Sequence, residues 1–176
     1  MPLLIRRAVA GDAPALASVA AATFPLACPP HTTDAAKADF IATHLSEARF
    51  RGYLADPARD LFIAEQDGAP TGYTMLVTGE PTDPDVVSAI STRPTAELSK
   101  VYVLPAAHGG GVASRLVAAS LDAARARGAA GVWLGVNQEN GRANRFYEKS
   151  GFALVGTKTF LVGDRYEDDF VRELVL

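Results

Sequence analysis

The sequence predicts a single α/β domain in which a mixed sheet carries helices on both faces. The chain has 176 residues, a length that suits one domain with a sizeable core. Hydrophobic residues make up 48% and charged residues 21% of the chain, as in ordinary globular domains. Strand and helix patterns follow the order β-ααα-ββ-β-α-β-α-ββ, without an internal repeat or a linker. We therefore expect one domain over residues 1–176.

The N-terminal half predicts six elements that are separated by turn and capping residues. Asp12 is a suitable N-cap for the first helix, and the stretch 25–30 (PLACPP) breaks the chain after it. Asp67-Gly68 is a dipeptide typical of hairpin turns. The expected elements are a strand at 3–9, helices at 13–22, 34–44 and 46–55, and strands at 61–65 and 71–78.

The C-terminal half begins with residues 79–95, which contain three prolines and little periodicity, so we expect a long loop there. Gly128 is a plausible end for the helix that follows the next strand, and Gly163-Asp164 joins the last two strands. The expected elements are a strand at 97–104, a helix at 109–127, a strand at 131–136, a helix at 140–149, and strands at 152–162 and 167–175.

Composition and charge exclude several classes of protein. The net charge of −3 and the pI near 5.6 are unlike the basic footprint of nucleic-acid-binding domains, so we expect no nucleic-acid partner. Cys28 is the single cysteine, which excludes an intrachain disulfide and fits a reducing compartment. No signal-peptide pattern and no stretch of ~20 apolar residues is present. We therefore expect a cytoplasmic protein without a membrane partner.

Three consecutive glycines in residues 108–113 (HGGGVA) lie between an expected strand and an expected helix. The first turn of a helix has unpaired N–H groups and a partial positive charge, and glycines allow a phosphate to approach the backbone. The segment therefore predicts a phosphate site, with a tight strand–helix connection as the alternative. A dinucleotide-binding fingerprint is disfavoured because the triplet is late in the chain and Ser114 stands where a third glycine belongs.

Two segments together resemble the cofactor motifs of the GNAT acetyltransferase superfamily. In the first, ELSKVYVLPAAHGGGVASRL (97–116), Gly111 and Ala113 match the pattern Arg/Gln-x-x-Gly-x-Gly/Ala, while His108 departs from its first position. The second is Asn-x-x-Ala-x-x-Phe/Tyr-Tyr followed by Gly-Phe, which is present as Asn140, Ala143, Phe146, Tyr147, Gly151 and Phe152. Within the superfamily, ATF (22–24), VWLGVNQEN (132–140) and GDRYEDDF (163–170) resemble the PaiA-type polyamine N-acetyltransferases.

The resemblance implies a mostly antiparallel sheet of about seven strands, with a splay between the fourth and fifth strands that admits acetyl-CoA. It implies that the backbone of Val101, Tyr102 and Val103 binds the pantetheine arm and that the Val103 N–H faces the acetyl carbonyl. The remaining residues expected to bind the cofactor are His108, Gly109, Gly110, Gly111, Val112, Ala113, Ser114, Asn140, Asn144 and Tyr147. The implied reaction acetylates a primary amine by direct attack, without a metal.

Two residues are the candidates for acid–base catalysis. An amine acceptor with a pKa near 10 must lose a proton before it attacks, and Glu97 is the expected general base. A period of two predicts that Glu97, Ser99, Val101 and Val103 share one strand face. The alternative roles of Glu97 are a salt bridge or binding of the cationic substrate. Tyr147 occupies the position of the family's general acid, which protonates the leaving thiolate; a core aromatic is the alternative. His44 and His108 are weaker candidates for the base.

The acceptor is less defined by the sequence. Carboxylates in the segments 23–54 and 79–95 could steer a polycation; they are Asp34, Asp39, Glu47, Glu80, Asp83 and Asp85. The cluster at 167–169 could do the same, or be a turn surface. The leading expectation is a small amine such as a polyamine. A protein or peptide acceptor, a non-catalytic acyl-CoA-binding module, and a homodimer all stay open. Trp133, Phe146 and Phe152 are expected in the core.

Overall fold

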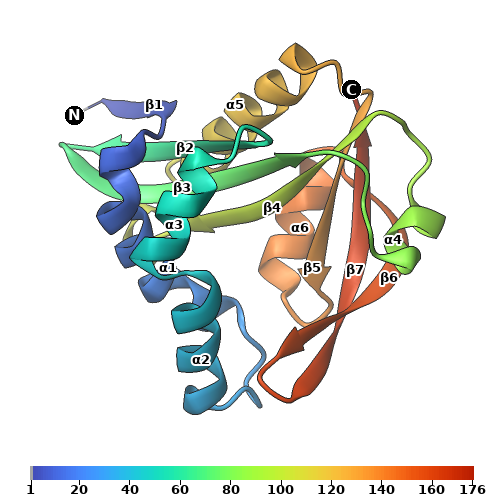
Figure 1. The fold of residues 1–176 in the computed structure, drawn as a ribbon, viewed down its shortest axis with the longest axis horizontal. Coiled ribbons are helices and arrows are strands. Elements are labelled where there is room, and N and C mark those ends of the chain that lie inside the picture. Colours follow the sequence, from blue (N-terminus) through green and yellow to red (C-terminus); the bar gives the residue numbers. More distant parts are fainter. Residues whose placement is uncertain (1) are drawn as a thin grey trace.

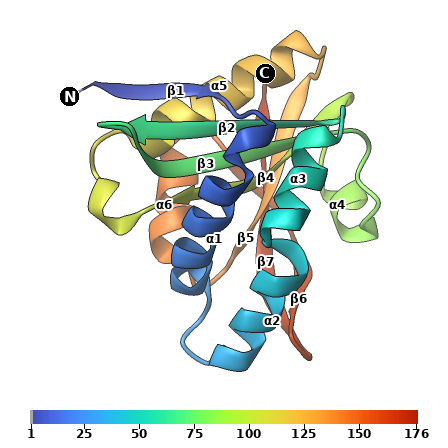
Figure 2. The same ribbon diagram turned by 60° about the vertical axis from the view of Figure 1, so that its left-hand side comes forward.

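The computed structural model describes residues 2–176, which form one seven-stranded sheet with helices on both faces (Figures 1 and 2). The strand order is β1-β2-β3-β4-β5-β7-β6, and all neighbours are antiparallel except the parallel pair β4–β5. The strands are β1 (Leu3–Arg7), β2 (Arg59–Gln66), β3 (Ala69–Thr78), β4 (Thr95–Val103), β5 (Gly131–Asn137), β6 (Ala153–Val162) and β7 (Arg165–Val175). The predicted mixed sheet is confirmed.

The helices divide the apolar residues between two faces of the sheet. One core lies under α5 and α6 and contains Leu98, Leu116 and Phe152; the other lies under α1, α2 and α3 and contains Phe24, Phe50 and Tyr73. The helices are α1 (Ala13–Ala27), α2 (Asp34–His44), α3 (Glu47–Ala55), α4 (Pro84–Ala89), α5 (Val112–Ala126) and α6 (Gly141–Lys149), with 3-10 turns at Ala10–Asp12 and Pro105–Ala107.

The sheet divides where β4 and β5 part. These parallel strands pair only through Thr95–Gly131, Ala96–Val132 and Glu97–Trp133. Beyond Glu97, β4 pairs with β3 alone and β5 with β7 alone, so their facing backbone edges are unpaired. In Figure 1, β2 and β3 run nearly across the view, whereas β5, β7 and β6 run steeply down it. The predicted splay between the fourth and fifth strands is confirmed.

A bulge in β4 changes which side chains share a face. Lys100 pairs with Met75 and Leu98 with Leu76, which leaves Ser99 without a partner. An extra residue reverses the alternation beyond it. Leu98 and Val101 therefore both pack under α5 and α6. The prediction that Glu97, Ser99, Val101 and Val103 share one face is wrong; Glu97 instead shares its face with Lys100 and Tyr102, on the side of α1, α2 and α3.

The C-terminal end of helix α1 and the role of Asp12 differ from the prediction. Helix α1 continues to Ala27 with Pro25 inside it, although a proline there donates no helix hydrogen bond, and the extra turn buries Phe24. Asp12 makes no capping bond to α1; its carboxylate accepts from the Val9 N–H at 2.7 Å and from Arg6 at 2.8 Å.

The expected loop at 79–95 contains the short helix α4. The Asp83 side chain accepts from the Asp85 N–H, and Pro84 occupies the first turn, where its missing N–H is not needed. Val86 and Ile90 pack against Trp133 and Val171 in a third apolar cluster. Trp133, Phe146 and Phe152 all lie in or against the apolar clusters, as predicted.

Candidate active site

Two cavities meet at the splay. The first, here called the acceptor-side cavity, has a volume of about 420 Å³ and lies between the splayed strands and α1 and α2. The second, the glycine-loop cavity, has a volume of about 430 Å³ and lies between the end of β4, the start of α5 and α6. Both cavities are lined by Val101, Val103, His108, Ala143 and Tyr147. A long ligand can therefore enter through one cavity and present its end to the other.

The backbone of Val103 faces the splay. The Leu104 N–H donates to the Thr71 carbonyl of the neighbouring segment, at 2.8 Å. Because successive amides of a strand point to opposite sides, the Val103 N–H points away from β3, into the gap between β4 and β5. The His108 ring lies on the same side, with Nε2 at 2.8 Å from the Val103 carbonyl oxygen. The splayed end of β4 thus offers a main-chain donor at the junction of the cavities.

The three glycines form the turn between β4 and α5. Gly109 (φ +83°) and Gly111 (φ +78°) are left-handed, a conformation that side chains disfavour. Gly110 is not, and a Cβ there would meet the Ala107 carbonyl at an ordinary 3.6 Å. Gly109 and Gly111 are therefore explained by backbone geometry alone, which supports the tight-connection interpretation without excluding a phosphate.

The start of α5 leaves main-chain donors free in the glycine-loop cavity. Its first intrahelical bond runs from the Arg115 N–H to the Gly111 carbonyl, so the N–H groups of residues 112–114 have no acceptor within the helix. Val112, Ala113 and Ser114 line the cavity with Gly109 and Gly111, whereas Gly110 does not. These donors and the helix dipole make the loop a suitable anion site.

Arg142 is a cavity residue that the sequence analysis missed. It lies in the first turn of α6, lines the glycine-loop cavity and is exposed. Its guanidinium has no ion-pair partner among residues 2–176. The sequence shows only that a basic residue lies two positions after Asn140. The fold is needed to show that this residue faces the start of α5.

Tyr147 lies at the junction of the two cavities. It is 9% exposed, and its ring makes edge contacts with Phe146 and Phe152 at centroid distances of 5.4 and 5.9 Å. Burial raises the pKa of its hydroxyl, mainly because the charged phenolate is poorly solvated there. The hydroxyl therefore keeps its proton at neutral pH.

The two asparagines of α6 differ in position. Asn140 lines the acceptor-side cavity, and its side chain caps the helix by accepting from the Ala143 N–H at 3.2 Å. Asn144 lines neither cavity. Its side-chain amide donates to the Asn137 and Asn140 carbonyls and accepts from Arg172, so its polar atoms are already used. We therefore leave Asn144 out of the candidate cofactor site.

Glu97 and Lys100 project from β4 into the acceptor-side cavity. Burial raises the pKa of Glu97, and the nearby Lys100 and Lys158 oppose that shift. Burial lowers the pKa of Lys100 to about 8, against the attraction of Glu97. Lys100 makes no hydrogen bond or ion pair among the described residues, 2–176. The charge of each group acts on the pKa of the other, although no hydrogen bond or ion pair joins them.

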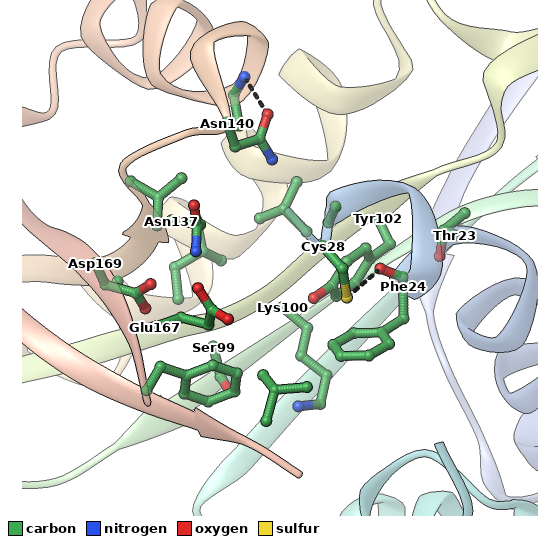
Figure 3. A pocket seen from close by; sticks show the side chains of 18 of the residues that line it. Thr23, Phe24, Cys28, Ser99, Lys100, Tyr102, Asn137, Asn140, Glu167 and Asp169 are labelled. Atoms are coloured by element: carbon green, nitrogen blue, oxygen red, sulfur yellow. Dashed lines mark hydrogen bonds between the residues drawn. The ribbon is translucent and has the colours of Figure 1, made fainter. Parts of the chain in front are cut away.

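A second group of charges lies on the hairpin formed by β6 and β7. Asp169 is opposite Lys158 across the hairpin, and both side chains lie over Gly135 of β5. Burial raises the pKa of Asp169 to about 6. Glu167 is bound by the Nε2 atom of His31, at 2.7 Å, from the loop between α1 and α2. Figure 3 shows Glu167 and Asp169 on one wall, Phe24 and Cys28 on the other, and Lys100 between them.

An aromatic wall completes the acceptor-side cavity. Phe24 stacks on Phe40 at 4.3 Å, and Phe160 contacts Phe40 edge-on at 5.5 Å. His44 lies beside Phe40, and burial together with Arg49 and Lys100 lowers the pKa of His44.

The acidic loops expected to steer a polycation lie outside the cavities. None of Asp34, Asp39, Glu47, Glu80, Asp83 and Asp85 lines either one. Asp34, Glu47 and Glu80 instead pair with nearby basic side chains at the surface. Of the late cluster, Glu167 and Asp169 do line the acceptor-side cavity, while Asp168 is exposed.

Comparison with known proteins identifies the class. A family model described as the acetyltransferase (GNAT) family matches residues 23–152. An uncharacterized N-acetyltransferase of Mycobacterium tuberculosis is 49% identical over 166 residues, which cover 93% of this chain and 99% of that protein. The chain therefore belongs to the GNAT acetyltransferase family and is an N-acetyltransferase. The family uses acyl-CoA as its donor.

Solved structures show the same fold. A PaiA N-acetyltransferase from Thermoplasma acidophilum, in complex with coenzyme A, superposes with a TM-score of 0.80 at 18% identity, with all of both chains covered. A ribosomal-protein-alanine N-acetyltransferase from Brucella melitensis superposes with a TM-score of 0.66 at 26% identity, over 98% of this chain and 99% of that one. No helix within residues 2–176 has both the length and the apolar character needed to cross a membrane.

Proposed function

We propose that this enzyme transfers the acetyl group of acetyl-CoA directly to a primary amine of a small acceptor. The observation that carries the proposal is the junction of the two cavities at the splay, where the Val103 N–H and Tyr147 lie. A thioester carrier in the glycine-loop cavity would present its acyl carbon to an amine in the acceptor-side cavity. The two substrates then react in one ternary complex.

Each end of the carrier has a matching part of the glycine-loop cavity. The pyrophosphate would accept hydrogen bonds from the free N–H groups at the start of α5, with Arg142 supplying a positive charge. The pantetheine amides would pair with the unpaired backbone of Val101 and Val103 as an additional strand does. This assignment makes Arg142 a phosphate-binding residue that the family pattern did not predict.

The chemistry divides between three groups of this chain. Glu97, which lies six residues along β4 from Val103, takes a proton from the ammonium of the acceptor through intervening water, and the freed lone pair attacks the thioester carbon. The Val103 N–H stabilises the oxyanion that forms, an interaction that can lower the barrier by ~3 kcal/mol. When the carbon–sulfur bond breaks, Tyr147 donates its proton to the leaving thiolate, and the second proton, which the nitrogen loses as the amide forms, returns to the Tyr147 phenolate. The raised pKa of the Tyr147 hydroxyl keeps the first proton available until the thiolate forms.

A polyamine is one acceptor within this proposal. Glu97, Glu167 and Asp169 in the acceptor-side cavity favour a cationic acceptor, and PaiA from Thermoplasma acidophilum shares the fold. Lys100 and Lys158 in the same cavity oppose a polycation. The acidic residues of segments 23–54 and 79–95, which were expected to attract a polyamine, line neither cavity and do not contribute to its binding.

The test is release of the coenzyme A thiol from acetyl-CoA with a panel of small amines, amino acids, polyamines and short peptides. We expect release that depends on a small primary amine and that falls at least tenfold in Glu97→Gln with the best acceptor. Release with peptides alone would favour a protein acceptor instead. No release with any amine, while coenzyme A binds, would contradict the proposal.

A further inference from the structure

We infer that the acceptor carries a carboxylate in addition to its amine and that Lys100 binds this carboxylate. The inference rests on the proposed function and names the class of acceptor, an amino-carboxylate with an apolar body. It depends on four features of the acceptor-side cavity: an ammonium without a partner, its position beside Glu97, a separate acidic wall, and an aromatic wall.

The bulge at Ser99 brings Lys100 into the cavity. Without the extra residue, the alternation of β4 would place Lys100 on the same side as Leu98, in the core under α5 and α6. With it, Lys100 and Glu97 are successive side chains on the acceptor-side face. A positive and a negative group therefore lie in sequence along the strand that borders the splay.

Among residues 2–176, Lys100 has no ion-pair or hydrogen-bond partner. Arg59 and His44 are the other basic groups near it, and Arg59 is engaged by Asp56 at 3.0 Å and lies over the Tyr53 ring at 4.9 Å. The Lys100 ammonium approaches the Tyr53 ring at 5.8 Å. A half-buried ammonium without an oxygen partner offers an incoming carboxylate a charge-assisted hydrogen bond.

The carboxylates of the acceptor-side cavity match the ammonium group of the acceptor. Glu97 lies where β4 and β5 part and lines the acceptor-side cavity together with Lys100. Asp169 and Glu167 lie on the opposite wall. Asp169 is opposite Lys158 across the hairpin, and Glu167 is bound by His31. An acceptor with only positive groups would bring a like charge to Lys100, whereas an amino-carboxylate brings a carboxylate to Lys100 and its ammonium to the neighbouring carboxylates.

The aromatic wall matches an apolar side chain on the acceptor. Phe24 and Phe40 lie across the cavity from the acidic wall, and Phe160, which is paired with Glu167 in the hairpin, extends their apolar surface to that wall. An aliphatic or aromatic side chain on the acceptor would cover this surface and displace water from it. Amino acids with large apolar side chains therefore fit the cavity better than flexible polyamines do.

The test compares acceptors that differ only in the carboxylate. L-phenylalanine, L-leucine and L-methionine are each measured beside their carboxamides, with spermidine as the polycation, by thiol release from acetyl-CoA. An α-amino group next to an amide has a pKa of about 8, so the amides lose their proton more readily. We expect kcat/KM at least tenfold higher for an acid than for its amide, despite this advantage of the amide.

Lys100→Met keeps the length and apolar stem of the side chain and removes the charge. We expect it to reduce the acid-over-amide ratio at least tenfold, with coenzyme A affinity by calorimetry as evidence that the variant is folded. Lys149→Met, an exposed lysine at the end of α6, is the matched control and should leave the ratio unchanged.

The outcomes separate the inference from the proposed function. Turnover in which spermidine or the amides equal or exceed the acids overturns the inference and leaves the proposed acetyl transfer standing. A preference for acids that persists in Lys100→Met overturns the role of Lys100. No thiol release with any of these amines contradicts the proposed function itself.

Discussion

Ionisable side chains in the acceptor-side cavity are displaced from their ordinary pKa values by burial. The pKa values of Glu97 and Asp169 are raised and that of Lys100 is lowered, because each charged form loses solvation. All three shifts bring the pKa values closer to neutrality, where proton transfer to and from an amine is most effective. Such perturbed groups gather at functional sites, and here they face one cavity.

Replacing Tyr147 with phenylalanine removes one oxygen atom from the junction of the cavities. We expect Tyr147→Phe to lower kcat about 100-fold, because the leaving thiolate loses its proton donor. Tyr166→Phe, on the exposed hairpin, is the control. Steady-state kinetics at saturating acetyl-CoA measure the effect. An unchanged kcat in Tyr147→Phe would make Tyr147 a packing residue.

The sequence predicts residues better where a motif fixes their surroundings than where the fold does. Tyr147 and the loop of residues 108–113, apart from Gly110, line the cavities. Asn144 shares its helix with Tyr147 but turns toward Arg172, because the spacing within a helix does not show which neighbours a side chain meets. Lys100 could not be recognised at all, since the bulge at Ser99 that redirects it depends on pairing with β3.

At the scale of elements, the turn before α5 combines two requirements. Gly109 and Gly111 allow the backbone to reverse, and the reversal directs the first N–H groups of α5 into the glycine-loop cavity. The same two residues therefore serve folding and, in the proposed function, phosphate binding. A matched pair of substitutions can test the folding role, because Gly110 has an ordinary conformation.

We expect Gly111→Ala to destabilise the protein by about 1–2 kcal/mol, the cost of a left-handed non-glycine residue. For a chain of this size, that lowers Tm by about 2–8 °C. Gly110→Ala should change stability by less than about 0.5 kcal/mol. Thermal unfolding without ligand measures both. Equal effects of the two substitutions would show that the turn is not held in this conformation.

The order of elements was predicted almost completely, whereas their ends were not. Helix α4 was missed because three prolines in residues 79–95 obscured a favourable start at Asp83-Pro84. Helix α1 was predicted too short because Pro25 was taken as a break, although it lies in the last turn. In both cases burial against the sheet outweighs the local signal, which is a tertiary effect that a single sequence does not contain.

At the scale of the whole molecule, the sheet is two halves joined at three residues of β4 and β5. The gap beyond them is lined by unpaired backbone and by charged side chains from β4 and β7. Groups of this kind oppose folding, and they lie together at the one place where the proposed function requires them. Stability and activity therefore respond to the same residues in opposite directions.

Asp169 gives a test of that opposition through pH. Its pKa is about 6 in the fold, against the ordinary aspartate value of 3.8, so the folded state keeps a proton that the unfolded state has lost. The resulting stabilisation is complete below pH 3.8 and is lost as pH rises through 6. Asp169→Asn removes this loss. The free energy of unfolding of the variant, relative to that of the wild type, should therefore increase from pH 4 to pH 7, by about 3 kcal/mol at most.

Thermal unfolding at several pH values measures this difference. Asp168→Asn, at the exposed neighbouring position, is the control and should show no comparable growth. A difference between Asp169→Asn and the wild type that stays constant with pH would mean that Asp169 titrates normally in the fold.

The most direct measurement is a crystal structure of the protein with acetyl-CoA. We expect the pyrophosphate at the N–H groups of residues 112–114, the pantetheine in the gap between β4 and β5, and the thioester oxygen within hydrogen-bonding distance of the Val103 N–H. The acetyl group would then face Glu97 and Lys100. A cofactor bound elsewhere, or a pantetheine outside the splay, would contradict the account.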